Sequence, residues 1–291
     1  MTLDLNKLKF DILDNFHRDL RPAVDEISRL NIEHQKKAQA VNSLAGQIRN
    51  AWINWIASLP TTDRTNASLV LQYCYSVASL EYRNKVWPYE YMAFSRRVGE
   101  LWEGFCSAAW NFPNRANVQR FSHPHFDDVR RTLRARLDSN IGGHARKTEL
   151  QADIDILFDI IGDINMREDE VFEVDGIPHV IDFKSGFGSN EKGNMLRLQT
   201  VGRAYKLWNL NTRLLLLVRQ STNNNYLRVL QNLGLWEVHT SDNAYNLISE
   251  LTGADIQQVR RMIIDWEHDL SPEFINHLSE QTTDLRAYLE W

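Results

Sequence analysis

The sequence predicts an α/β protein in which a central mixed β-sheet is flanked by helices, with helical N- and C-terminal segments around this core. Between residues 150 and 240, short apolar runs that suit strands alternate with segments of helical periodicity. The two ends of the chain instead show long stretches with few Gly or Pro and apolar residues at helical spacing. We therefore expect a helical N-terminal region (1–95), an α/β core (96–250) and a helical C-terminal segment (251–291).

The strongest local signal is a β-hairpin around Asp175 and Gly176. This dipeptide separates two apolar-rich runs, 171–174 and 177–181, and Asp-Gly favours the two-residue turns that join antiparallel strands. The second run continues into Asp182-Phe183-Lys184. Because alternate residues of a strand point to the same face, Asp182 and Lys184 are expected to project side by side.

The segment at residues 152–158, before the hairpin, has two interpretations. Its Asp-Ile-Asp-Ile alternation favours a half-buried strand. A capping box of Thr148 and Gln151, with Gly162 as a stop signal, instead favours a helix from Thr148 to Ile161. We predict the strand, because strict alternation suits a period of two better.

After the hairpin, the sequence predicts a regular succession of helices and strands. A Gly- and Asn-rich loop, 186–194, precedes a helix that we place at 195–208. The continuous apolar run at 213–219 suits a strand that is covered on both faces. A helix at 225–233 and a strand at 235–239 follow. This order is typical of an α/β protein with a mixed sheet.

Acidic residues accumulate just before Asp182 and Lys184. From Glu149 to Asp175 the chain carries ten acids and one base, Arg167. Magnesium prefers hard oxygen ligands, and a lysine beside them can position or deprotonate an attacking water. The pattern therefore indicates a metal-dependent hydrolytic site; without a metal, Asp182 and Lys184 would be an ion pair at the edge of a sheet.

The Asp182-Phe183-Lys184 motif and the order of elements around it resemble the PD-(D/E)XK nuclease superfamily, and within it a type II restriction endonuclease. The resemblance covers residues 96–240, about half of the chain. It implies a restriction-endonuclease-like core that hydrolyses phosphodiester bonds of double-stranded DNA at a specific short sequence, as part of a restriction–modification defence. It also implies one or two Mg²⁺ ions in each active site.

The same resemblance implies roles for individual residues. Asp182, the backbone carbonyl of Phe183 and an acid on the preceding strand would hold the metal, and Lys184 would act on the attacking water. The proline-aspartate pair of the family is absent, so the first acid has no unique match. We rank Asp155 first, because it lies inside the predicted strand. The alternatives are Asp153, Asp163 and Asp169.

These alternatives have support of their own. Asp153 shares a strand face with Asp155. Asp163 lies 19 positions before Asp182, a spacing that suits the family. Asp169 would lie across the hairpin from Asp182 if Asp175 and Gly176 form a two-residue turn.

Many members of the family add a glutamate from a helix that precedes the sheet. Residues 95–105 are predicted to form such a helix, with Val98, Leu101, Trp102 and Phe105 on its buried side. Glu100 and Glu103 flank this stripe. The resemblance favours Glu103 as a catalytic residue that completes the outer shell of the metal, because of its spacing from Gly99; both would otherwise be surface glutamates.

Residues that contact DNA are predicted from charge. From Arg115 to Lys147 there are eight Lys or Arg and three acids, although the whole chain has a formal net charge of −5. Four arginines of this segment would hold phosphates: Arg130, Arg131, Arg134 and Arg136. Candidates for contacts with bases follow the strand that ends at Lys184: Asn190, Lys192, Asn194 and Arg197. Without DNA, these sets would be a solvated helix face and turn-forming or helix-capping residues.

Composition and the absence of certain sequence patterns restrict the class of protein further. The fractions of apolar and charged residues, 43% and 24%, are ordinary for a globular protein. No apolar run could span a bilayer, the N-terminus lacks a signal-peptide pattern and no P-loop is present. Cys74 and Cys106 form no CxxC and are predicted to be buried thiols in a reducing compartment. We expect a cytoplasmic bacterial or archaeal protein with no membrane partner.

The expected partners follow from the resemblance. A symmetric double-strand cut is most simply made by a homodimer, for which the helical segments would supply contacts or DNA grip. A cognate DNA methyltransferase would belong to the same system. Three tryptophans are predicted to be core residues: Trp87, Trp102 and Trp110.

Two other functions are compatible with these residues. The first is a DNA repair or recombination nuclease of the same fold. Recombination-type exonucleases often carry Gln and Tyr four positions apart after the lysine strand, whereas here Arg203 follows Gln199 at that spacing. The second is a non-catalytic helical binding protein in which Asp182 and Lys184 are a surface pair.

Overall fold

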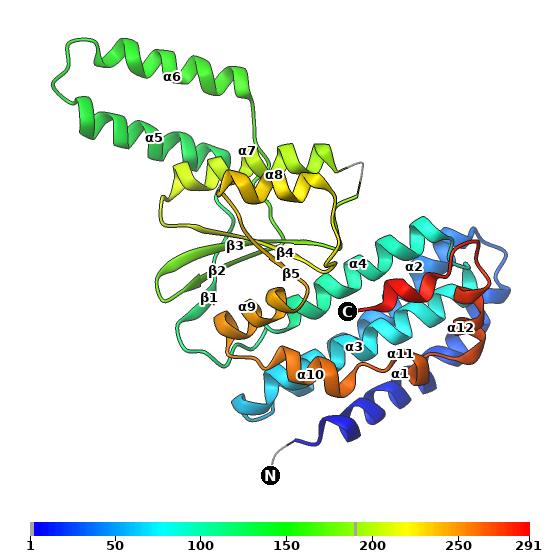
Figure 1. The fold of residues 1–291 in the computed structure, drawn as a ribbon. Coiled ribbons are helices and arrows are strands. Elements are labelled where there is room, and N and C mark those ends of the chain that lie inside the picture. The colour runs from blue at the N-terminus through cyan, green and yellow to red at the C-terminus, as the bar shows by residue number, and fades with distance from the viewer. Residues whose placement is uncertain (1–2, 189–190) are drawn as a thin grey trace. The chain divides into compact units, whose positions relative to one another are not determined.

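The computed structural model describes residues 3–188 and 191–291, and the chain divides into two compact units (Figure 1). One unit combines Met1–Ala116 with Asp242–Trp291, and the other is Asn117–Ser241. The first is helical and the second is α/β, as the sequence predicts. The second unit is shorter than the predicted core of residues 96–250, because helices at both ends of that range belong to the helical unit.

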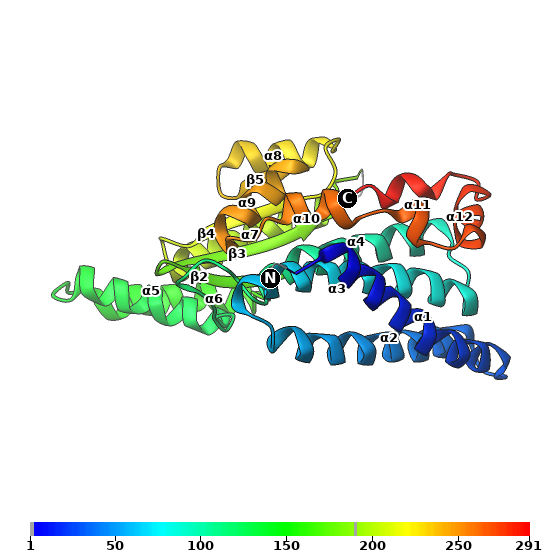
Figure 2. The ribbon, with the colours of Figure 1, turned by 90° about the horizontal axis from the view of Figure 1, so that it is seen from below.

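The helical unit is organised around one long helix. Its elements are α1 (Leu5–Arg29), α2 (His34–Ala57), α3 (Thr61–Val86), α4 (Tyr91–Ala108), α9 (Asp242–Thr252), α10 (Ile256–Ile263), α11 (Trp266–Asp269), α12 (Pro272–Ser279) and the 3₁₀ helix η1 (Leu285–Leu289). Helix α3 contacts α1, α2 and α4 (Figure 2). Consecutive residues such as Leu69, Val70 and Leu71 are all buried, as expected for a helix that is surrounded by others.

Asp269 ties the C-terminal segment to the first helices. Its Oδ2 accepts hydrogen bonds from Lys9 Nζ at 2.8 Å and from Tyr73 Oη at 2.7 Å. Trp266 packs edge-on against the Tyr73 ring, with 4.9 Å between ring centroids. Helices α1, α3 and α11 are thus joined by one partly buried carboxylate.

Helix α4 belongs to the helical unit because of its aromatic contacts. Trp102 donates a hydrogen bond of 2.7 Å to Tyr245 Oη on α9, and the rings of Phe105 and Trp291 lie 5.4 Å apart. Trp102 and Trp110 are buried, which confirms two of the three predicted core tryptophans. The prediction for Trp87 is wrong: it is 40% exposed.

The predicted burial of the two cysteines is confirmed. Cys74 lies in α3 and Cys106 in α4, and both are fully buried free thiols. No helix among the described residues is long and apolar enough to cross a membrane.

The α/β unit contains the mixed sheet. Its elements are β1 (Val118–Arg120), α5 (Phe126–Ile141), α6 (Lys147–Ile161), β2 (Glu170–Val174), β3 (Ile177–Lys184), α7 (Lys192–Trp208), β4 (Arg213–Val218), α8 (Asn225–Leu233) and β5 (Glu237–Thr240). Within the described residues the sheet has five strands in the order β1-β2-β3-β4-β5. Strand β2 is antiparallel to both of its neighbours, β1 and β3, whereas β3, β4 and β5 are parallel.

Helices α7 and α8 cover one face of this sheet, and α5 and α6 extend from it as a helical hairpin (Figure 1). Val180, Leu214 and Leu216 of the sheet form a core with Leu198 and Tyr205 of α7. The hairpin, the helix at 225–233 and the apolar strand at 213–218 confirm the predictions for these segments.

The strand predicted at residues 152–158 is wrong, because these residues lie in α6. Ile154 and Phe158 are one helical turn apart, and both pack against the hydrophobic core. The Phe158 ring lies 5.2 Å from Phe126 of α5. Gly162 follows the helix with a φ of 74°, so the helical alternative was correct about its end.

We predict that Gly202→Ala destabilises the protein by about 1–3 kcal/mol. An added Cβ at this position of α7 would lie 2.7 Å from Trp236 Nε1 and 2.9 Å from Leu235 Cδ2, closer than ordinary packing allows. Gly193→Ala, on the same helix with open space around it, is the control and should be neutral or stabilising. Urea unfolding of both variants measures the difference; equal stabilities would contradict the prediction.

Candidate active site at the end of the β2–β3 hairpin

The β2–β3 hairpin brings two acids opposite each other. Val174 pairs with Ile177 and Glu170 with Ile181, so the same antiparallel register places Asp169 opposite Asp182. The turn is formed by Asp175 and Gly176, whose φ values are 51° and 78°. This confirms the predicted two-residue turn and the expectation that follows from it for Asp169.

Asp182 is almost fully buried and touches two cations. Its Oδ1 contacts Lys184 Nζ, and its Oδ2 accepts a hydrogen bond of 2.6 Å from Arg197 Nη2. Lys184 and Asp182 lie on the same strand face, and Arg197 comes from α7, which covers that face. Lys184 Nζ also donates to the Phe183 carbonyl at 3.0 Å.

Glu168 and Asp169 complete a group of three carboxylates. Glu168 is buried, and both of its oxygens accept hydrogen bonds from Arg197 Nη1, at 2.8 and 3.0 Å. Asp169 is exposed as a residue, and its Oδ2 accepts a hydrogen bond of 2.6 Å from the Phe183 backbone N–H. The group therefore extends from the protein interior to the surface.

The close carboxylates change one another's acidity. Burial, followed by a hydrogen bond and the charge of Asp182, raises the pKa of Glu168 to about 8. Enclosure of the Asp169 carboxyl and the charge of Asp182 raise the Asp169 pKa to about 6. Burial raises the pKa of Asp182, but the hydrogen bond from Glu168 and the charges of Lys184 and Arg197 outweigh it and hold this pKa below its ordinary value. The raised pKa of Glu168 and the lowered pKa of Asp182 mean that Glu168 takes up a proton more readily than Asp182 does.

The loop after Lys184 is held by the loop after β4. Arg219 Nη2 donates to Ser185 Oγ at 2.7 Å, and the Phe187 backbone N–H donates to Asn223 Oδ1 at 2.8 Å. A Cβ on Gly186 would lie 2.0 Å from Gln220 Oε1, so the two loops approach closely at this glycine. These contacts fix the direction in which the chain leaves β3.

The structure does not place Asp155 beside Asp182. Asp155 lies on α6 and accepts hydrogen bonds from Arg134 Nε at 2.9 Å and Arg130 Nε at 3.3 Å. We ranked Asp155 first because residues 152–158 were predicted to form a strand. They form a helix, since the packing of Ile154 and Phe158 outweighs the local alternation. Asp153 lies on the same helix, and Asp163 in the loop that follows it.

Glu103 and Glu100 lie on α4 in the helical unit, whereas Asp182 and Lys184 lie in the α/β unit. Glu100 accepts hydrogen bonds from Arg96 and Arg97 of its own helix. Within the α/β unit the structure brings Glu168 to Asp182, a glutamate that the sequence analysis missed. Its signal was its position next to Asp169, just before the first strand of the hairpin.

The predicted DNA-binding arginines all lie on α5 and have intramolecular partners. Arg130 and Arg134 bind Asp155, Arg131 binds Asp128, and Arg136 Nη2 donates to the Leu207 carbonyl at 2.7 Å. The Arg131 side chain is 77% exposed and therefore reaches solvent despite its partner.

The predicted base-contacting residues divide into three groups. Asn190 lies outside the described residues. Lys192 and Asn194 are exposed in the first turn of α7, where Asn194 donates to the Glu191 side chain. Arg197 binds Asp182 and Glu168 and thus belongs to the carboxylate group.

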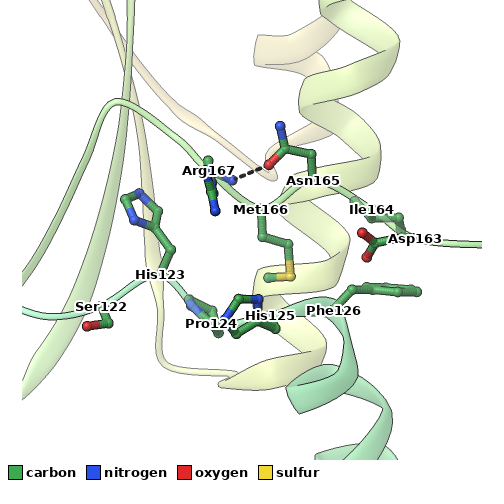
Figure 3. A pocket seen from close by; sticks show the side chains of 10 residues that line it. All are labelled: Ser122, His123, Pro124, His125, Phe126, Asp163, Ile164, Asn165, Met166 and Arg167. Carbon is green, nitrogen blue, oxygen red and sulfur yellow. Dashed lines mark hydrogen bonds between the residues drawn. The ribbon is translucent and has the colours of Figure 1, made fainter.

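A pocket of about 720 Å³ is lined in part by the residues that directly precede Glu168 and Asp169 in the sequence. Figure 3 shows its lining, which comes from residues 122–126 after β1 and 163–167 before β2. His123 Nε2 lies 2.8 Å from the Glu168 carbonyl oxygen. The pocket wall and the main chain that carries Glu168 are therefore joined by a hydrogen bond.

The donor set suits a hard divalent cation. Asp169, Asp182 and Glu168 provide carboxylate oxygens, and the Phe183 carbonyl lies next to them. Oδ1 of Asp182 is buried and contacts Lys184, but it accepts no well-aligned hydrogen bond in the described part of the chain. As they stand, no three Asp, Glu, His or Cys side chains of the described residues are arranged to hold a metal ion. The residues present therefore fit a Mg²⁺ ion in chemistry, and binding it requires a rearrangement of side chains.

Comparison with protein-family models, with curated proteins and with solved structures gives no significant match for this chain.

Without divalent metal, Glu168→Gln should gain stability relative to the wild type as the pH rises from about 4.5 to about 8. The folded pKa of Glu168, about 8, lies above its ordinary value of 4.5. The stability that this proton contributes is complete below the ordinary value and is lost as the pH rises through the folded value.

Urea unfolding in EDTA at about pH 5 and about pH 9 tests this, and the difference between the two proteins should change by more than about 1 kcal/mol. Glu149→Gln, at an exposed position of α6, is the control. A pH-independent difference for Glu168→Gln would show that Glu168 is ionised in the folded protein.

Proposed function

We propose that this chain is a Mg²⁺-dependent endonuclease that cleaves double-stranded DNA at a specific short sequence, like a type II restriction enzyme. The observation that carries the proposal is the β2–β3 register, which sets Asp169 opposite Asp182, two residues before Lys184. In the PD-(D/E)XK superfamily the first acid lies on the strand before the acid-x-lysine strand. Asp169 directly precedes β2 and so lies one residue from this position, and a mixed sheet is compatible with a restriction-endonuclease-like core.

In this proposal Asp169, Asp182 and the Phe183 carbonyl hold Mg²⁺. Glu168 takes the place that the sequence analysis gave to Glu103. The bound ion would polarise the scissile phosphate and offset charge that develops on it. Lys184, held by Asp182 and the Phe183 carbonyl, orients the water that attacks phosphorus.

The arginine-rich helix α5 is proposed to hold the DNA backbone. Arg131 is exposed, whereas the other three candidate arginines are half-buried. Arg130 and Arg134 are neutralised in part by Asp155. Phosphates can compete with such surface pairs, because an exposed ion pair contributes little free energy.

A homodimer with contacts from the helical unit is proposed as the assembly that cuts both strands. Two-fold symmetry would place one active site on each strand of a symmetric sequence. A cognate methyltransferase would protect the host DNA.

Incubation of the protein with plasmid DNA and Mg²⁺, and in parallel with EDTA, tests the function. Discrete bands that require Mg²⁺ support a site-specific endonuclease. A smear would point to a repair or recombination nuclease of the same fold, and unchanged plasmid to a non-catalytic protein.

Asp169→Asn, Asp182→Asn and Lys184→Ala should each lower the rate of cleavage by at least about 100-fold. The first two remove a proposed metal ligand, and the third removes the group that orients water. Asp155→Asn is the matched control, because it removes an acid that binds Arg130 and Arg134 on another element. Cleavage rates on a plasmid, with circular dichroism to confirm folding, measure the effect. Loss of activity in Asp155→Asn but not in Asp169→Asn would reverse the assignment of the first acid.

Replacing Arg131 and Arg136 by Ala should weaken binding to all DNA sequences about equally. The slope of log K against log salt should fall by about 0.9 for each phosphate contact that is lost. Fluorescence anisotropy with a labelled duplex at several salt concentrations measures the slope. If it stays unchanged, α5 is a solvated helix and does not contact DNA.

A further inference from the structure

Arg197 occupies the carboxylate oxygens that a metal ion would need. Its guanidinium donates to Asp182 Oδ2 at 2.6 Å through Nη2, and to Glu168 through Nη1. The other oxygen of Asp182 contacts Lys184. Two monovalent cations therefore cover both oxygens of the buried Asp182 carboxylate.

Arg197 stands between these carboxylates and solvent. The side chains of Glu168 and Asp182 are 0% and 1% exposed, whereas that of Arg197 is 39% exposed. Its backbone is fixed, because its helix neighbours Met195 and Leu198 are packed in the core. The long side chain can thus move to solvent while the helix stays in place.

A divalent cation at Asp182 Oδ2 would compete with Arg197, because two cations that share this oxygen repel each other. Arginine does not lose its proton in proteins, so it leaves the carboxylate only by moving. Its planar guanidinium binds phosphate as well as carboxylate with two parallel hydrogen bonds. A phosphate at the rim of the site would therefore offer Arg197 an equivalent partner.

We propose that Arg197 is a displaceable cation of the site: it holds Asp182 and Glu168 when no metal is bound, and on metal binding it turns to a phosphate of the bound DNA strand. The competition with metal follows from the contacts above, and the phosphate partner rests on the proposed function.

Mn²⁺ binding, measured by electron paramagnetic resonance without DNA, tests the competition. Arg197→Ala should bind Mn²⁺ about fivefold more tightly or better than the wild type, because the ion no longer displaces a side chain. Arg203→Ala removes an exposed arginine of the same helix and should leave the affinity unchanged. Thermal unfolding followed by circular dichroism confirms that each variant is folded.

Arg197→Lys separates displacement from a general effect of charge. Lysine keeps the charge but lacks the fork that bridges two carboxylates, so this variant should also bind Mn²⁺ more tightly than the wild type. Unchanged affinity in Arg197→Lys, or weaker binding in a folded Arg197→Ala, would overturn the competition. Arg197→Lys also supplies the answer if Arg197→Ala does not fold.

DNA binding tests the second half of the proposal. In the Lys184→Ala background, to prevent cutting, Arg197→Ala should lower the salt slope of duplex binding by about 0.9 with Mn²⁺ and leave it unchanged in EDTA. If Arg197→Ala changes the salt slope by the same amount with Mn²⁺ and in EDTA, Arg197 does not turn to a phosphate on metal binding. If the Arg197 variants bind Mn²⁺ more tightly but the protein binds no DNA, the competition stands and the proposed function is refuted. If the wild type cleaves DNA with a metal but the Arg197 variants bind Mn²⁺ as the wild type does, the function stands and the competition is refuted.

Discussion

The register of the β2–β3 hairpin is the constraint on which the candidate site depends. Asp175 and Gly176 adopt positive φ values, which Asp tolerates and Gly adopts freely, and this conformation matches the twist of the two strands. The register that starts at this turn ends with Asp169 opposite Asp182. A slip of β3 by one residue would turn Asp182 to the other face of the sheet, away from α7 and Arg197. A turn at one end of the hairpin thus sets the chemistry at the other.

The energetics of the carboxylate group explain why it has so many partners. A buried carboxylate is costly unless it is paired and hydrogen-bonded, and two adjacent carboxylates repel each other. Arg197, Lys184 and the proton on Glu168 together offset this cost. Groups whose acidities are pushed apart in this way are common where a protein performs chemistry, because a packed core without function has no need for them.

The sequence predicted those parts of the fold in which local signals agree. The turn at Asp175, the apolar strand before Arg219 and the helix that begins at Asn225 all have local signals that agree with the tertiary packing. Residues 152–158 were mispredicted because alternation over four residues competes with a helical pattern that includes Phe158, and contact with Phe126 decides between them. Glu168 and Arg197 could not be assigned from the sequence, since their meeting depends on how α7 lies across the sheet.

The exposure of its members shows on which side the carboxylate group is open to solvent. Asp182 is buried, Lys184 is 19% exposed and Asp169 is exposed, so the carboxylates open to solvent at the start of β2. The chain after Lys184 is held by Arg219 and Asn223, which keeps its position beside the opening defined. A negatively charged ligand that approaches there meets Asp169 first, and two acids behind it. In the proposed function, a divalent ion and an arginine that is free to leave Asp182 would together offset this negative charge.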